Sequence, residues 1–247
     1  MDLGICGRTA LVTGASRGLG FACARALAQE GADLILVARS AAPLARAASS
    51  LSAESGVKIA CVAADVATEA GRAQILAAGP PPDILINNAG GPRNGDFRGL
   101  TPADWAHALD TNFLAAVELI RATADGMAAR GFGRIVNITA MSGRMPVAQL
   151  ELSNAARLAL TGYVASVSRQ IAASGVTLNN LLPGTISTER IAELGDTARD
   201  LIAKVPAGRA GTPQEFGAVC AFLCSEQAAY ITGQNILVDG GLCAFAV

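Results

Sequence analysis

The glycine-rich stretch at residues 13–20, TGASRGLG, constrains the fold of this chain more than any other segment. The apolar run before it, residues 9–12, is typical of a buried strand, and residues 21–28 after it are typical of a helix. Its glycines remove side chains where the chain turns sharply and where a phosphate would approach the backbone: Gly14, Gly18 and Gly20. The free amides and the dipole of a helix N-terminus also favour an anion. We therefore expect a dinucleotide site here, with a tight strand-to-helix turn that binds nothing as the alternative.

Strand-like and helix-like stretches alternate along the rest of the 247 residues. We predict strands at residues 33–38, 58–63, 83–86, 133–139, 176–181 and 235–238. We predict helices at residues 41–55, 68–77, 101–130, 150–173 and 212–224. Thr101 and Thr212, each followed by proline, are typical of helix N-caps. The alternation indicates one α/β domain over residues 1–247, a Rossmann doubly wound parallel sheet with helices on both faces.

One segment does not fit this regular pattern. Residues 190–204 are polar, irregular and lie between motifs. We expect this segment to be mobile, within a substrate-side segment at residues 185–210. An ordinary pair of surface helices is the alternative.

The composition excludes several classes of protein. A net charge of −1 gives no reason to expect a nucleic acid or an anionic membrane as a partner. No apolar run is long enough to span a membrane, and the first residues do not form a signal peptide. The six cysteines are scattered and His107 is the only histidine, so we expect no metal site, and reduced thiols in the cytoplasm.

Further motifs follow the glycine stretch. They are DV at 65–66, NNAG at 87–90, Asn112 within DTNF, GRIVNI at 133–138, PG at 183–184, and ITG at 231–233 followed by VDGG at 238–241. With these motifs the chain resembles the classical short-chain dehydrogenase/reductases over nearly its whole length. Within that family it is most similar to the 3-oxoacyl-acyl-carrier-protein reductase group.

The resemblance implies a nicotinamide cofactor and assigns residues to each part of it. The phosphates would contact the glycine stretch, the adenine would contact the DV motif, the ribose the NNAG motif, and the nicotinamide the PG motif. The implied residues are, in that order, Gly14, Ser16, Arg17, Gly18, Leu19 and Gly20; Asp65 and Val66; Asn88, Ala89 and Gly90; and Pro183, Gly184 and Ile186. A strand-end turn, which asparagine favours, is the alternative for residues 87–88.

The end of the second predicted strand indicates which nicotinamide cofactor is bound. An NAD site carries a carboxylate here for the ribose hydroxyl, whereas an NADP site carries a cation for the 2′-phosphate. This strand ends at Arg39 and Ser40 without any aspartate or glutamate, and Arg17 lies in the glycine turn. Two guanidinium groups could hold one phosphate, so we predict NADP(H) as the cofactor. The alternative is that both arginines face water.

The catalytic serine, tyrosine and lysine of the family are absent. In the family the tyrosine follows the serine by thirteen residues, and the lysine follows the tyrosine by four. Counted from the GRIVNI motif, these three positions hold Ala140, Ser153 and Arg157. No tyrosine of the chain is followed four residues later by a lysine, so no shift of the register restores the pair.

Ser153 and Arg157 would lie on one face of a helix, because they are four residues apart. Arginine can hold a ribose hydroxyl and supply positive charge, but it does not release its proton, and serine is a far weaker acid than tyrosine. As the proton source we expect a water held by Asn112 and Arg157 and delivered through Ser153. The alternatives are a helix-start cap for Ser153, an interface ion pair for Arg157 and a buried structural amide for Asn112.

Three functions fit this sequence. The first is an NADP(H)-dependent reductase of a small-molecule carbonyl substrate, either a ketone or a 3-oxoacyl thioester. The second is a cofactor-binding protein that has lost catalysis and serves as a sensor or a partner subunit. The third is isomerisation or dehydration on the same scaffold, and the fold alone does not choose among them.

The resemblance also implies a homotetramer or homodimer. Members of the family pair through two long helices, here residues 101–130 and 150–173. The second helix carries small residues that would allow close packing: Ala155, Ala156, Ala159 and Gly162. Packing of these residues within one monomer is the alternative. We expect the apolar tail, residues 242–247, to be buried at a subunit contact.

Overall fold

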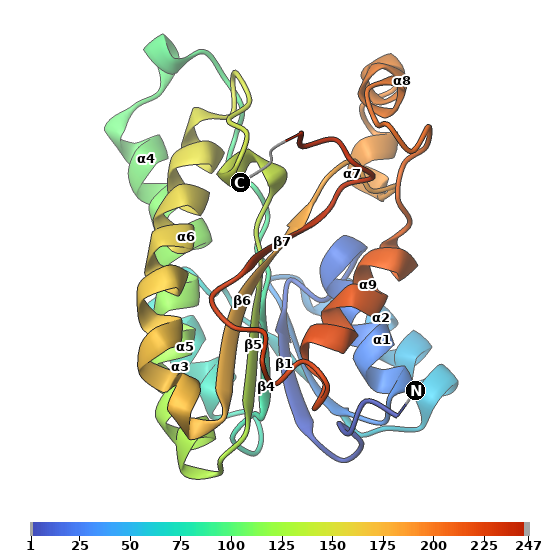
Figure 1. Cartoon of the computed structure of the whole chain (residues 1–247), viewed down its shortest axis with the longest axis vertical. Helices are drawn as coiled ribbons and strands as arrows, with labels where there is room; N and C mark the ends of the chain where they lie inside the picture. Colours follow the sequence, from blue (N-terminus) through green and yellow to red (C-terminus); the bar gives the residue numbers. More distant parts are fainter. Residues whose placement is uncertain (1, 245–247) are drawn as a thin grey trace.

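The computed structural model describes residues 2–244, whose seven strands form one sheet. The strand order is β3-β2-β1-β4-β5-β6-β7, and every pairing is parallel. Figure 1 shows this sheet between two layers of helices. The strand order reverses between β1 and β4, and in such sheets a ligand binds at the carboxyl ends of the strands beside this point. The predicted Rossmann α/β fold is therefore confirmed.

The strands lie where the sequence predicted them, with ends that differ by no more than two residues. They are β1 (Thr9–Thr13), β2 (Asp33–Ala38), β3 (Ile59–Ala63), β4 (Ile84–Asn87), β5 (Gly133–Ile138), β6 (Val176–Pro183) and β7 (Asn235–Val238). The central strands are buried on both faces because helices cover both sides.

The helices divide between the two faces of the sheet. In Figure 1, α1 (Gly18–Gln29), α2 (Ala41–Ser55) and α9 (Pro213–Leu223) lie on one side. On the other side lie α3 (Glu69–Leu76), α4 (Pro102–Leu109), α5 (Ala115–Ala129) and α6 (Glu151–Ile171). The predicted N-caps are confirmed: Thr101 and Thr212 each accept from a backbone amide three residues later and complete a capping box.

Each face of the sheet has its own apolar core. Side chains alternate along a strand, so Ile84 and Ile86 of β4 face α1 and α9, where they join the cluster that contains Phe216. Leu85 faces the other way and joins Leu119 of α5 in the second cluster. The two cores hold the sheet rigidly between its helices, and this fixes the positions of the strand ends.

The helix predicted at residues 101–130 is not continuous. A π-helical turn, Asp110–Leu114, separates α4 from α5. Residue type and spacing alone do not reveal such a turn, so the sequence analysis predicted one continuous helix. Such turns are frequent at functional sites, and Asn112 lies in this one.

The segment predicted to be mobile contains two short helices, which was the alternative. They are α7 (Glu189–Ala192) and α8 (Asp196–Ala203), and α8 has no buried residue. In Figure 1 α8 stands away from the body of the molecule, above α7. The amphipathic sequence of α8 forms a helix although little of it is covered by the rest of the chain.

The predicted apolar tail is described only in part. Leu242 and Cys243 are half-buried, and the Cys243 amide donates to the Asp239 carboxylate over 2.8 Å. The prediction for residues 245–247 lies outside the described residues.

Three cysteines from two distant segments of the sequence meet between α1 and α9. Cys23, Cys220 and Cys224 are fully buried there, and burial raises the pKa of the Cys23 and Cys224 thiols well above the ordinary value.

In residues 2–244, no helix has both the length and the apolar character that crossing a membrane requires.

Candidate active site

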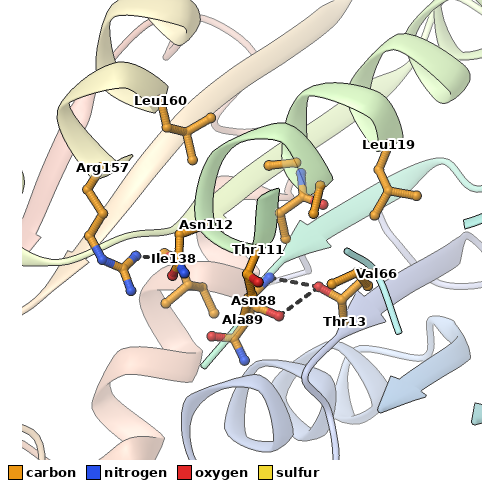
Figure 2. Close-up of a pocket in the computed structure, with 13 residues that line it drawn as sticks. Thr13, Val66, Asn88, Ala89, Thr111, Asn112, Leu119, Ile138, Arg157 and Leu160 are labelled. Atoms are coloured by element: carbon orange, nitrogen blue, oxygen red, sulfur yellow. Dashed lines mark hydrogen bonds between the residues drawn. The ribbon is translucent and has the colours of Figure 1, made fainter. Parts of the chain in front are cut away.

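The glycine turn after β1 packs directly against the end of β4. The Asn88 amide nitrogen donates to the Thr13 hydroxyl over 2.8 Å (Figure 2). The Asn88 side chain donates to the Gly14 carbonyl over 3.2 Å. A Cβ atom at Gly20 would lie 2.3 Å from the Gly14 carbonyl oxygen, and one at Gly14 would lie 2.5 Å from the Asn88 side chain. Gly14 also has φ +60°. Only glycine fits at these two positions.

Other glycines of the motifs face open space. No described atom lies within 4 Å of a Cβ atom built at Gly18 or Gly90. The backbone at these two positions is therefore accessible to a ligand at the N-terminus of α1 and at the end of β4. This arrangement fits the pyrophosphate and ribose of a dinucleotide.

The two arginines predicted at the 2′-phosphate are both exposed, and the structure gives Arg17 a partner on another element. Arg17 Nη1 lies 3.4 Å from the Glu189 carboxylate at the start of α7. Arg39 lies one residue past the end of β2. Sequence reasoning missed Glu189, because no pattern links a residue of the glycine turn to a segment 172 residues away.

The remaining residues predicted around the cofactor lie just after strand β3 and at or just after the end of strand β6. The Asp65 carboxylate accepts from the Ala67 amide over 3.0 Å, and Val66 lines the same cavity as Asn88 and Ala89. A Cβ atom at Gly184 would lie 2.6 Å from the Asp239 Cα. Ile186 is buried and pairs with Gly211. Pro183 is the last residue of β6.

Arg157 and Ser153 lie on the same face of α6, as predicted, and they contact each other. Arg157 Nε donates to Ser153 Oγ over 3.2 Å, and Arg157 Nη1 donates to the Ile138 carbonyl at the end of β5 over 3.2 Å. Figure 2 shows the guanidinium reaching from α6 toward Ile138. Arg157 is only 8% exposed, so within this chain it is an interior residue.

Ser153 and its neighbour Asn154 have different hydrogen-bond partners and therefore different roles. Asn154 donates to the Val147 carbonyl over 2.9 Å and so holds the loop before α6. Ser153 caps no helix, since the N-cap of α6 is Leu150 and has no side-chain cap. The serine hydroxyl instead accepts from the guanidinium four residues later.

Asn112 lies in the π-helical turn and is 6% exposed. Both polar atoms of its amide are buried without a hydrogen-bond partner in the part of the chain that the structure describes. The predicted alternative, a structural amide that stabilises the fold, requires partners for those atoms. Asn112, Arg157 and Thr111 line a cavity of about 20 Å³ that also touches Asn88 and Ile138 (Figure 2).

Two hydroxyl groups near Ala140 are also buried without a hydrogen-bond partner among the described residues. They are Thr139 Oγ1 and Ser142 Oγ. Ala140 itself is extended and precedes the short 3-10 turn Met141–Gly143. His107, in contrast, is exposed on α4 and takes no part in this group.

Comparison with known proteins places this geometry in a family. A family model described as enoyl-(acyl carrier protein) reductase matches residues 14–243. The 3-oxoacyl-(acyl-carrier-protein) reductase FabG of Vibrio cholerae is 38% identical over 238 residues, which cover 96% of this chain and 97% of that relative. The chain belongs to the short-chain dehydrogenase/reductase family.

Solved structures share the fold along nearly all of the chain. The L-sorbose reductase of Gluconobacter frateurii, complexed with NADPH and L-sorbose, is 32% identical with a TM-score of 0.94, and the match covers 99% of this chain and 100% of that one. A 3-oxoacyl (acyl-carrier-protein) reductase of Agrobacterium tumefaciens with NADP bound is 32% identical with a TM-score of 0.88, covering 97% of this chain and 95% of that one.

For this short-chain dehydrogenase/reductase, sequence reasoning missed part of the polar group around the cavity. Asn87 Oδ1 and Thr111 Oγ1 are buried there without a partner in residues 2–244. Both residues belong to motifs that the sequence analysis quoted. Their side-chain directions depend on the strand register and on the π-helical turn, and neither can be deduced from motif spacing.

Proposed function

We propose that this protein is an NADP(H)-dependent reductase of a ketone or a 3-oxoacyl thioester, with an active site that lacks the family's tyrosine. The observation that carries the proposal is the contact between Arg157 and Ser153 beside a cavity lined by Asn112. The NADP(H) bound by the solved relatives and the reductase names of the curated relatives support it.

The residues of the carboxyl strand ends would hold the cofactor. The glycine turn would bind its phosphates, residues 65–66 its adenine, residues 88–90 its ribose, and residues 183–186 its nicotinamide. Arg39 and Arg17 would hold the 2′-phosphate, since both guanidinium groups are exposed near the turn. When bound, NADPH supplies the hydride that reaches the carbonyl carbon.

Ser153 would donate the proton to the carbonyl oxygen. Because its oxygen accepts from Arg157 Nε, the serine's own O–H remains available for the substrate. The guanidinium also stabilises negative charge on the serine oxygen as the proton leaves. A water held by Asn112 would then return a proton to Ser153 and would itself regain one from the solvent. In this scheme Arg157 remains protonated throughout and acts through its charge and its hydrogen bonds.

The expected reductase is slow. Loss of a well-matched general acid costs on the order of 10²–10⁴-fold in rate. Orientation of the hydride donor and the ketone can still supply roughly 7–11 kcal/mol of the barrier. Turnover therefore remains measurable on these magnitudes.

NADPH oxidation against a panel of ketones and a 3-oxoacyl thioester tests the proposal. We expect turnover that falls at least about tenfold in Ser153→Ala, while the dissociation constant for NADPH stays unchanged. Asn154→Ala is the matched control, because it changes the next residue and the loop but not the proton path. Tight NADPH binding without any turnover would instead support a sensor or partner subunit, and an undiminished rate in Ser153→Ala would remove the serine from the mechanism.

A double variant tests the active site from the other direction. Ser153→Tyr with Arg157→Lys restores the residue types that the family carries at these positions. If the natural chain is a reductase, the double variant should change its rate. Turnover that exists only in the double variant would argue that the natural chain is not a reductase.

We also propose that the chain forms a homotetramer or homodimer through α6. Ala155 and Gly162 are exposed in the monomer, and Leu158 between them is 46% exposed. Ala156, in contrast, is buried within the monomer. Light scattering after size exclusion tests the proposal. Gly162→Glu should give a monomer, whereas Arg169→Glu near the end of the same helix should not.

Residues 185–210 are proposed as the substrate side of the site. The ion pair between Arg17 and Glu189 supports this, because it connects the glycine turn to α7. Limited proteolysis tests it: we expect NADPH to protect this segment, and equal cleavage with and without NADPH would contradict it.

We further propose that the protein works in the cytoplasm, where its thiols remain reduced.

A further inference from the structure

Four asparagines on four neighbouring strands form a continuous row of hydrogen-bonded side chains. Asn87 of β4 pairs in register with Asn137 of β5, Asn137 with Asn180 of β6, and Asn180 with Asn235 of β7. The side-chain amides connect over 2.9, 3.0 and 2.8 Å in that order. We call these four residues the asparagine ladder.

The ladder lies in the core on the side of α5 and α6. The row of side chains next to it on the same face is apolar and also in register: Leu85, Ile135 and Leu178. Asn137 and Asn180 are fully buried, and Asn87 is 5% exposed. A polar row at this depth is unfavourable unless its members satisfy one another, which the ladder does along its length.

The ladder has a direction. Each Nδ2 donates to the Oδ1 of the next strand, from Asn87 through Asn137 and Asn180 to Asn235. At the β4 end this leaves the Asn87 carbonyl oxygen, which is buried and lacks a partner among the described residues. The opposite direction would be equally continuous, but it would present the Asn87 NH₂ group instead. The ladder therefore decides whether Asn87 offers an acceptor or a donor at its free end.

That free end lines the cavity of the candidate active site. Asn87, Thr111 and Asn112 all line it, and their unpartnered atoms are Asn87 Oδ1, Thr111 Oγ1 and both polar atoms of the Asn112 amide. The space in the cavity that the centre of a water molecule can occupy is about 20 Å³, which is enough to hold one. A water needs two to four polar partners, and these atoms offer both donors and acceptors.

We propose that the asparagine ladder is a positioning device that presents the Asn87 carbonyl as an acceptor and so orients a single water in this cavity. Asn180 and Asn235 act through Asn137 and Asn87, although Asn235 lies on the outermost strand of the sheet. The effect on turnover rests on the proposed function, whereas the water and the amide direction do not.

Two variants of Asn235 test the ladder with little risk to folding, since this residue is half-buried on the edge strand. Asn235→Asp keeps an acceptor for Asn180 and preserves the direction, whereas Asn235→Leu removes it. Asn180→Leu breaks the ladder inside the sheet. Its matched control is Asn179→Leu, because Asn179 is equally buried on the same strand but bonds to Ile231 and Gln234 on the other face.

The primary readout is structural and uses the NADP-bound protein. A neutron structure of the natural chain should show a water between Asn87 Oδ1 and Asn112, with Asn87 Nδ2 directed to Asn137. By NMR, hydrogen exchange of the Asn87 side-chain amide should be roughly 2–10-fold faster in Asn235→Leu and Asn180→Leu, the range expected for one weakened hydrogen bond. It should stay within about twofold of the natural chain in Asn235→Asp and Asn179→Leu.

Two results would overturn the proposal. The first is a neutron structure in which Asn87 Nδ2, rather than Oδ1, faces the cavity. The second is the same amide exchange rate in Asn235→Leu and Asn235→Asp. Where turnover is measurable, kcat should fall in Asn235→Leu with KM for the ketone unchanged, and Asn235→Asp should restore it. Absence of turnover in the natural chain would count against the reductase but leave the ladder tested by the structural readouts.

Discussion

The glycine turn and the site at the start of α6 use their polar groups in opposite ways. Around the turn, the hydroxyl of Thr13, the amide of Asn88 and the carbonyl of Gly14 satisfy one another. Around α6, the side chains of Asn112 and Ser142 are buried with polar atoms that have no partner in residues 2–244.

In the folded chain, the polar groups around the glycine turn have hydrogen-bond partners, whereas several of those around α6 have none among the described residues. A buried polar atom without a partner costs about 1–3 kcal/mol, so several of them together are a substantial cost in a protein of ordinary stability. The hydrogen bonds of the turn are thus made within the chain itself. The α6 side retains unmet hydrogen-bonding capacity, which is what a site for a polar reacting group requires.

The largest effect is expected where the turn is tightest. Gly20→Ala places a methyl group 2.3 Å from the Gly14 carbonyl oxygen, and the backbone there is held by Asn88. We expect NADPH affinity to fall at least about 100-fold, because the turn must open to accept the methyl group. A fluorescence titration with NADPH measures this.

Gly217→Ala is the matched control for steric overlap away from the turn. Its Cβ atom would lie 2.6 Å from the Ala22 carbonyl oxygen, between α9 and α1. Thermal unfolding should show a loss of stability comparable with that of Gly20→Ala, whereas NADPH affinity should be retained. Equal losses of affinity in both variants would mean that the turn has no special role.

Arg157→Met should produce the next largest effect. It keeps most of the buried side-chain volume but removes the donors to Ser153 and Ile138. We expect turnover to fall by about 100-fold, the lower end of the range for a lost general acid, because Ser153 loses the charged donor that stabilises its oxygen. Arg157→Lys should recover part of the rate, and Arg169→Met on the exposed side of α6 should have no effect. Steady-state kinetics would contradict the assignment if Arg157→Met and the natural chain turned over equally.

Arg39→Asp should change cofactor choice by a smaller factor. A carboxylate after β2 repels the 2′-phosphate of NADP and accepts from the ribose hydroxyl of NAD. We expect the preference for NADPH over NADH to fall by roughly 10–100-fold, the range of one charge-assisted hydrogen bond. Arg46→Asp on the exposed surface of α2 is the control. The measurement is the ratio of the dissociation constants for NADPH and NADH in each variant. An unchanged ratio in Arg39→Asp would mean that Arg39 faces only water.

The smallest effect should be a loss of folding stability at low pH. This loss should be similar for the helix start on each side of the sheet. Arg209 and Thr212 lower the pKa of Glu215 at the start of α9 to about 2, and Arg93 holds the pKa of Asp104 at the start of α4 well below its ordinary range. Because each pKa is lower in the folded state, each carboxylate stabilises the fold above its ordinary pKa, near pH 4, and this stabilisation is lost as the pH falls toward 2.

Thermal unfolding between pH 7 and pH 2 measures this loss. Glu215→Gln and Asp104→Asn should each lower the melting temperature slightly at pH 7, and the difference from the natural chain should narrow below pH 4.5. A difference that widens in acid would contradict the direction of the pKa shift. If the melting temperatures of the two variants changed differently with pH, the two helix N-termini would contribute unequally to the stability of the fold.

The sequence predicted well those features that depend on short-range patterns. The glycine turn, the strands and the N-caps at Thr101 and Thr212 follow from residue type and spacing, and the structure confirms them. The contact between Ser153 and Arg157 was also predictable, because residues four apart in a helix are neighbours.

Features that depend on how distant segments align were not predictable. The asparagine ladder requires the register of four strands, and the ion pair of Arg17 with Glu189 connects residues 172 positions apart. The cysteine group between α1 and α9 likewise appears only when the two helices pack. Single-sequence patterns contain no information on such pairings.

The π-helical turn before α5 has a consequence for insertions and deletions. Removing one residue from Asp110–Leu114 would close this wider turn into a regular α-helix and change the directions of the side chains within it. Asn112 would then leave the cavity while the sheet and both apolar cores remained intact. A change of a single codon in length, with no exchange of a polar side chain, is thus enough to dismantle this corner of the pocket.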